Sequence, residues 1–142
     1  MNAPTPSSSQ PLPTPALDAR GLPVGTALKP DWEVTPRSVR DIMQRPAAER
    51  PILLDVRRDE EFAHSRIAGA EHIPLADLEK RAADLEDDAG ARTRPIITYC
   101  HHGVRSLKAA ATLRAIGYVD VRSMAGGIDL WSLDIDPKVP RY

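Results

Sequence analysis

The sequence predicts an α/β fold of three layers, an α/β/α arrangement with a mainly parallel sheet of about five strands. Two observations carry this prediction. Short apolar runs of the kind found in buried strands, such as residues 52–56 and 95–99, alternate with segments whose apolar residues recur every three or four positions. The chain also has 142 residues, which is enough for one domain with a substantial core.

The expected elements alternate between strands and helices along the chain. Short apolar or alternating runs predict strands at residues 32–34, 52–56, 71–73, 95–99 and 119–122. Apolar residues on one face predict helices at residues 36–44, from residue 59, and at residues 75–85, 106–116 and 128–131. Thr35 and Pro36 suit the start of the first helix, and Gly117 suits the end of the fourth. This alternation places helices between parallel strands.

Composition separates a tail from the domain. Residues 1–30 are rich in proline and serine and poor in bulky apolar residues, so we expect a flexible N-terminal tail followed by a domain over residues 31–142. The formal net charge of −1 gives no reason to expect nucleic acid as a partner. No apolar run is long enough to span a membrane, and the first ten residues lack the pattern of a secretory signal. A single cysteine excludes an internal disulfide and favours the cytoplasm.

That cysteine lies at the most informative point of the chain. Cys100 follows the strand at residues 95–99 and precedes a Gly-containing loop and a helix. Such a junction directs backbone N–H groups and the positive end of the helix dipole at whatever occupies the loop. Gly103 permits a close backbone approach, and Arg105 offers a fork of donors for an oxyanion. We therefore expect a nucleophilic thiolate that attacks an anionic substrate.

Other polar residues fall near the same edge of the predicted sheet. Asp55, Arg57 and Arg58 follow the strand at residues 52–56, so we expect Asp55 to pair with Arg105 or a loop amide and the arginines to steer anions. His101 and His102 are adjacent, and their side chains should point different ways. No metal site and no cofactor are therefore predicted.

The segment Cys100-His101-His102-Gly103-Val104-Arg105-Ser106 resembles the active-site loop of single-domain rhodaneses, which are sulfurtransferases. Further motifs occur in the order and spacing of that family: Leu54-Asp55-Val56-Arg57, Glu60-Glu61-Phe62, residues 67–75 and residues 125–131. The ending, residues 135–142, is similar to the rhodanese domains attached to E1-like enzymes that activate sulfur carriers. One departure is Arg66, which lies where many members have a histidine, and it would add positive charge near the mouth of the site.

The resemblance implies a rhodanese-like fold and a double displacement. Cys100 would take a sulfane sulfur from thiosulfate or a persulfide donor and pass it to cyanide or a thiol, including a protein sulfur carrier. Arg105 would orient the donor, and the amides from His101 to Ser106 would stabilise the bound sulfur anion.

Two other functions remain open at this stage. An arsenate reductase or a cysteine phosphatase on a related fold would also use such a loop, although phosphatases place five residues between cysteine and arginine and this chain places four. A non-catalytic sulfur- or redox-sensing module is the third possibility.

Overall fold

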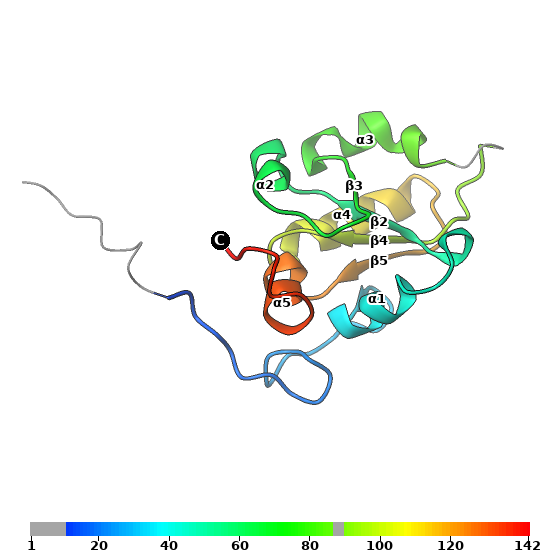
Figure 1. Ribbon diagram of the computed structural model, residues 1–142. Coiled ribbons are helices and arrows are strands. Elements are labelled where there is room, and N and C mark those ends of the chain that lie inside the picture. Colours follow the sequence, from blue (N-terminus) through cyan, green and yellow to red (C-terminus); the bar gives the residue numbers. More distant parts are fainter. Residues whose placement is uncertain (1–10, 87–89) are drawn as a thin grey trace, which may run out of the picture.

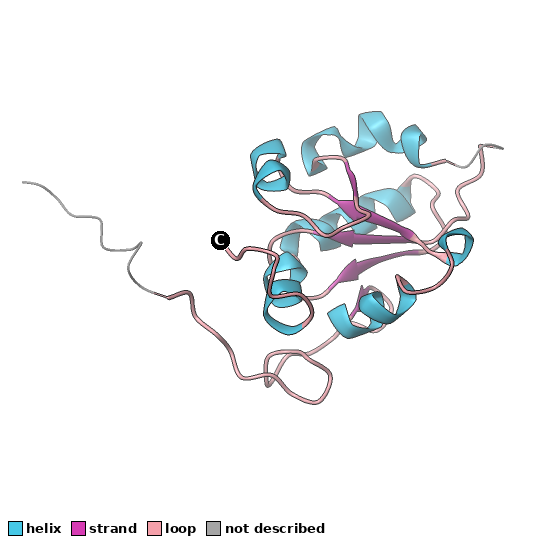
Figure 2. Ribbon diagram, in the orientation of Figure 1, coloured by secondary structure: helices cyan, strands magenta, loops and turns pink. Residues whose placement is uncertain are grey.

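The computed structural model describes residues 11–86 and 90–142, and in them a five-stranded sheet lies between helices on both faces (Figures 1 and 2). The strands pair in parallel in the order β1-β5-β4-β2-β3. They are β1 (Glu33–Val34), β2 (Ile52–Asp55), β3 (Glu71–His72), β4 (Ile96–Tyr99) and β5 (Val121–Met124). The predicted α/β class and parallel sheet are confirmed.

The helices form the two outer layers. They are α1 (Pro36–Ile42), α2 (Asp59–His64), α3 (Leu78–Arg81), α4 (Val104–Ala115) and α5 (Gly127–Asp134), with 3-10 turns at Ala47–Glu49, Leu75–Asp77 and Ala82–Leu85. One apolar core joins α3 and α4 to one face of the sheet, and a second joins α1 and α5 to the other. No described helix has the length and apolar character needed to cross a bilayer.

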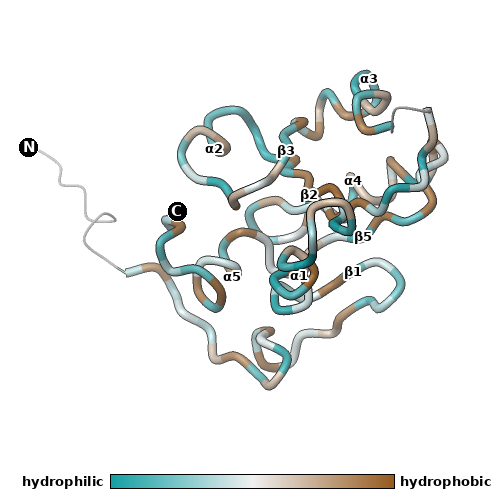
Figure 3. Tube along the Cα trace, turned by 45° about the vertical axis from the view of Figure 1, so that its right-hand side comes forward, coloured by the Kyte–Doolittle hydropathy of each residue, from teal (hydrophilic) through white to brown (hydrophobic). Residues whose placement is uncertain are grey.

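The two central strands are buried along their whole length. Every residue of β2 and of β4 is inaccessible or nearly so, as their continuous apolar runs predict. Hydrophobic colours accordingly follow β2 through the interior in Figure 3, whereas α2 is largely hydrophilic. Because these strands are parallel neighbours, their carboxyl ends meet at one edge of the sheet, where Asp55 and Tyr99 are paired in register.

Several boundaries differ from the predicted ones. The helix expected over residues 75–85 is divided into a 3-10 turn, the four-residue α3 and a second 3-10 turn. The last strand runs two residues later than expected, because Val119 is largely exposed and the buried positions begin at Val121. The prediction from apolar character alone therefore began this strand two residues too early.

The segment that precedes β1 is not all tail. Leu22 is fully buried against Ala125 and Leu130, and Leu17 forms an isolated bridge with Pro23. Arg37 of α1 also donates to the carbonyl of Ala19. Residues 17–23 therefore pack on the domain, in contrast to the flexible tail expected over residues 1–30. The first ten residues of that predicted tail lie outside the described part of the chain.

Candidate active site

The cysteine loop starts where β4 ends. Cys100 is the first residue after the strand and is 1% exposed. Gly103 has a φ of 110°, a left-handed conformation that folds the loop back before α4 begins at Val104. The amides of Gly103 and Ser106 point at the Cys100 sulfur, with N···Sγ distances of 3.1 and 3.4 Å. The predicted amide cradle is thus present at these two positions.

The start of α5 holds the other side of this loop. The amide of Ile128 donates to the carbonyl of Cys100 at 2.8 Å, and the amide of Asp129 donates to the carbonyl of His101 at 3.1 Å. Gly127 lies against the same carbonyl groups, where a Cβ atom would overlap them. The peptide groups that join Cys100 to His101 and His101 to His102 are therefore held with their carbonyls toward α5.

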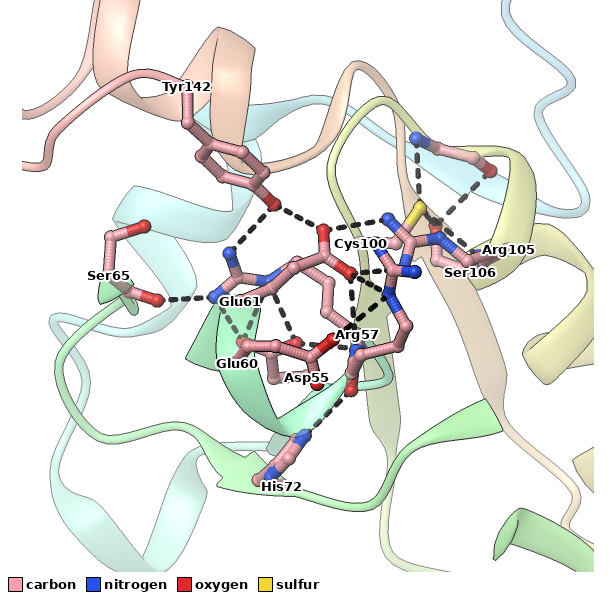
Figure 4. Close-up of polar contacts among 12 residues, drawn as sticks. Asp55, Arg57, Glu60, Glu61, Ser65, His72, Cys100, Arg105, Ser106 and Tyr142 are labelled. Carbon is pink, nitrogen blue, oxygen red and sulfur yellow. Dashed lines mark hydrogen bonds and ion pairs between the residues drawn. The ribbon is translucent and has the colours of Figure 1, made fainter. Parts of the chain in front are cut away.

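Arg105 forms a two-pronged ion pair with Glu61 of α2. Its Nη1 and Nη2 donate to Oε1 and Oε2 of the carboxylate at 2.6 and 3.0 Å (Figure 4). The hydrogen bonds from Arg105 hold the pKa of Glu61 well below its ordinary value, and Glu61 in turn raises the pKa of Arg105. The guanidinium is thus fixed beside the loop in its charged form.

Tyr142 completes this network from the segment after α5. Its hydroxyl donates to Glu61 Oε2 at 2.6 Å and accepts from Arg57 Nη1 at 2.9 Å (Figure 4). Burial and the hydrogen bond to Glu61 raise the pKa of Tyr142 to about 12, so the hydroxyl stays protonated. Its ring stacks on the imidazole of His101, with centroids 3.9 Å apart.

The ion pair expected between Asp55 and Arg105 is absent, because both side chains have other partners. Asp55 is fully buried and binds Arg57, whose Nε and Nη2 lie 2.7 to 3.1 Å from its carboxylate oxygens. Arg57, expected to steer anions, is fully buried as well and also donates to the carbonyl of Ser65. Burial opposes its charge, but the bonds to Asp55 and Tyr142 outweigh that effect and raise its pKa. The Asp55–Arg57 pair is therefore a buried structural contact beneath the surface of the site, and it is not accessible to an anion in solvent.

The remaining predicted arginines lie at the surface. The Arg58 side chain is 73% exposed. Arg66 is also exposed and lies over the ring of Phe62, 4.2 Å from its centroid. Arg58 and Arg105 line a pocket of about 540 Å³ whose other walls are apolar, formed by Val56, Pro74, Leu75 and Ala76. This pocket thus combines two cations with an apolar surface, and Arg105 is the residue that connects it to the cysteine loop.

The two histidines of the loop do not point apart as expected. Their ring centroids are 3.8 Å apart, and the ring of His101 lies between those of His102 and Tyr142. Burial, with the neighbouring His102, lowers the pKa of His101. His101, His102 and Asp129 bring potential ligand atoms within 4.8 Å of one another, the one such group in the described chain.

A metal ion is not the partner that this group favours. Both carboxylate oxygens of Asp129 accept hydrogen bonds from Arg141, at 2.8 and 3.2 Å. This carboxylate therefore already has a cationic partner.

Sequence reasoning missed three residues of the site. Glu61 was noted only as part of a motif, and Tyr142 only as part of an ending, although both hold Arg105 in place. Ser123 of β5, whose hydroxyl is 2.7 Å from that of Ser106, was not singled out. The predicted strand ended at Arg122, one residue before Ser123, so local pattern gave no signal for this residue.

Together these features define a class: a parallel α/β domain with a cysteine in an amide-lined loop at the carboxyl edge of its sheet. The chain belongs to the family described as Rhodanese-like domain, whose profile matches residues 35–134. The resemblance seen in the loop and its flanking motifs is thereby confirmed.

Relatives and solved structures agree with this assignment. The chain is 36% identical over 99 residues to the thiosulfate sulfurtransferase GlpE of Actinobacillus succinogenes, covering 70% of this chain and 82% of that protein. It is 31% identical over 114 residues to the adenylyltransferase and sulfurtransferase UBA4 of Candida albicans, covering 78% of this chain but 26% of that longer protein. The human single-domain sulfurtransferase TSTD1 superposes with a TM-score of 0.62 at 29% identity, over 72% of this chain and 96% of that one.

Proposed function

We propose that this protein is a rhodanese-type sulfurtransferase that carries a sulfane sulfur on Cys100. The observation that carries the proposal is the pair of amides, from Gly103 and Ser106, directed at a buried cysteine sulfur. Amides in that position stabilise a negative charge on sulfur, both on the thiolate and on a persulfide. A persulfide adds one atom about 2.05 Å beyond Sγ, which a loop with four residues between cysteine and arginine accommodates.

Transfer takes place in two displacements. The Cys100 thiolate attacks the outer sulfur of thiosulfate; the S–S bond of the donor breaks, and sulfite leaves with the electron pair. A Cys100–S–S⁻ persulfide remains. Cyanide or a thiolate then attacks the outer sulfur, and Cys100 leaves as the thiolate with the electrons of the bond it had formed. A persulfide donor reacts in the same way and releases a thiolate.

Arg105 binds the anionic part of the donor. Glu61 takes one N–H from each of its terminal nitrogens, so three of the five guanidinium donors, the Nε–H and one on each terminal nitrogen, are left for a substrate. Arg58, exposed on the same pocket, adds a second cation at the entrance. Donor recognition therefore combines one arginine that Glu61 holds in place and one that is largely exposed.

The acceptor and the cellular setting belong to the same proposal. The relative UBA4 is an adenylyltransferase and sulfurtransferase, and this supports a protein sulfur carrier as an acceptor beside small thiols and cyanide. A persulfide cysteine requires a compartment that keeps thiols reduced, so we place the protein in the cytoplasm. We propose no membrane or nucleic-acid partner.

A sulfur-loading experiment tests the function. The protein is incubated with thiosulfate, its intact mass is measured, and cyanide is then added while thiocyanate is followed. We expect a mass increase of one sulfur atom on Cys100 and its loss with formation of thiocyanate. Cys100→Ser is the matched control and should show neither. Absence of the adduct in the wild type, together with hydrolysis of a phosphoryl ester, would instead favour the phosphatase alternative.

A further inference from the structure

A chain of three buried groups leads from the cysteine into the sheet. The Cys100 thiol donates to Ser106 Oγ at 3.4 Å, and Ser106 Oγ lies 2.7 Å from Ser123 Oγ. Both serines are fully buried. In the described part of the chain, the Ser123 hydroxyl has Ser106 as its hydrogen-bond partner and no other. The inference below rests on the proposed function, because it concerns the thiolate on which that function depends.

The topology explains how a β5 residue reaches this loop. Ser123 is opposite Thr98 in the parallel pairing of β4 with β5, two residues before Cys100. Ser106, in the first turn of α4, lies over the same position, and its carbonyl accepts a hydrogen bond from Thr98 Oγ1 at 2.8 Å. The Ser106 side chain therefore lies between the sulfur and Ser123.

The hydrogen bonds of this chain reverse when the cysteine ionises. In the thiol form, the S–H group donates to Ser106 Oγ, and the Ser106 hydroxyl donates to the carbonyl of Gly103 at 3.2 Å. When the thiol proton leaves for solvent, the Ser106 hydroxyl can turn toward the sulfur. The Gly103 carbonyl keeps a partner, because the amide of Leu107 also donates to it. No proton passes along the chain; only the direction of donation changes.

Ser123 supplies the donor that this reversal needs. When Ser106 donates to the thiolate, Ser106 Oγ no longer accepts a hydrogen bond from the S–H group. Because Ser106 is fully buried, its oxygen then has a donor only if the Ser123 hydroxyl supplies one. A hydroxyl group whose oxygen accepts a hydrogen bond is also a stronger donor to an anion. We propose that Ser123 is a positioning residue that stabilises the Cys100 thiolate through Ser106.

Charged groups around the sulfur are separate from this chain. Arg105 of α4 interacts electrostatically with Cys100, and Glu61 of α2 is paired with that arginine. His101, next in the loop, is stacked on Tyr142. None of them contacts Ser123, so substitution of that serine leaves them in place.

The test uses alkylation of Cys100, which needs neither sulfur donor nor acceptor. The rate constant for reaction with neutral iodoacetamide is measured against pH for the wild type and for Ser123→Ala. We expect the variant profile to move to higher pH, with a rate constant at neutral pH about three- to tenfold lower, as loss of one hydrogen bond to the chain implies. In a Ser106→Ala background, Ser123→Ala should have no further effect.

Thr98→Val is the matched control. It removes an equally buried hydroxyl that binds the Ser106 carbonyl but has no path to the sulfur, so it should leave the pH profile in place. If Ser123→Ala does not fold, Ser123→Thr and Ser123→Val are compared, because they share a shape and differ in the hydroxyl. The inference is wrong if two folded proteins that differ in the hydroxyl at position 123, either the wild type and Ser123→Ala or Ser123→Thr and Ser123→Val, have the same pH profile of alkylation. Since alkylation is independent of sulfur loading, failure here and failure of the proposed function are distinguishable.

Discussion

Arg105 and Glu61 are 44 residues apart in the sequence, yet they form a two-pronged ion pair beside the cysteine loop, with Nη1···Oε1 at 2.6 Å. The pair joins the first turn of α4 to α2 and directs the guanidinium over the pocket. If Arg105 binds the sulfur donor as proposed, this geometry gives Glu61 a role in donor binding without any contact to the sulfur.

Glu61→Gln should weaken donor use. The neutral amide keeps the shape of the side chain but loses the ionic fork, so Arg105 is no longer held in one orientation. We expect kcat/KM for thiosulfate to fall about tenfold while the variant stays folded. Steady-state thiocyanate formation at varied thiosulfate provides the measurement. Glu60→Gln removes a neighbouring carboxylate that is 75% exposed, and its kinetics should match the wild type. Equal losses in both variants would contradict the role assigned to Glu61.

The same ion pair predicts a pH dependence of stability. Because the folded-state pKa of Glu61 is lowered from its ordinary 4.5, the unfolded chain takes up a proton at this residue first as the pH falls. The stabilisation is complete above pH 4.5 and is lost progressively below it. Urea unfolding of the wild type and Glu61→Gln across this range should show a difference in unfolding free energy that narrows with acidity. A constant difference would show that the carboxylate charge is not the cause.

Tyr142→Phe should loosen the network while preserving the stack on His101. The variant loses the hydroxyl that bridges Glu61 and Arg57, which leaves one donor and one acceptor short of a partner. We expect a loss of unfolding free energy of about 1 to 2 kcal/mol and a higher KM for thiosulfate. Tyr118→Phe is the control, because that buried hydroxyl binds the carbonyl of Ala82 on the α3 side. It should lower stability without altering the KM, and an unchanged KM in Tyr142→Phe would remove Tyr142 from donor binding.

Gly127→Ala should displace the cysteine loop. A Cβ atom there would overlap the carbonyl groups of Cys100 and His101, and the residue has a φ of 60°. Gly69→Ala separates the two effects, because Gly69 has a φ of 85° with open space around it. Both variants should lose about 1 kcal/mol from the left-handed backbone, but Gly127→Ala should lose more and also lose sulfur loading. Thermal unfolding and intact mass are the measurements, and equal effects would contradict the clash.

Local pattern was sufficient for the two central strands and the loop. Apolar runs identify β2 and β4, and the loop between β4 and α4 follows from a cysteine and a glycine at a strand-to-helix junction. These features depend on residues that are close together in the sequence.

The supporting contacts could not be obtained in the same way. Asp55 was expected to pair with Arg105 because both lie at the carboxyl edge of the sheet. Arg57 is two residues from Asp55 on the same extended chain, and it binds the carboxylate instead. Glu61 and Tyr142 are 81 residues apart, and nothing local indicates that they meet. Burial of Leu22 likewise depends on a pocket formed by residues more than a hundred positions later.

The hydrogen bonds from α5 to the carbonyls of Cys100 and His101 have a consequence for the cost of each turnover. Peptide groups that are already oriented by those bonds have no dipoles left to reorganise when a negative sulfur arrives. The empty and the sulfur-loaded loops should then share one backbone here, and amide hydrogen exchange at His101 and His102, the N–H groups of those two peptide planes, should be equally slow in both. For the proposed sulfur transfer, the order of these two peptide groups would be acquired once, during folding.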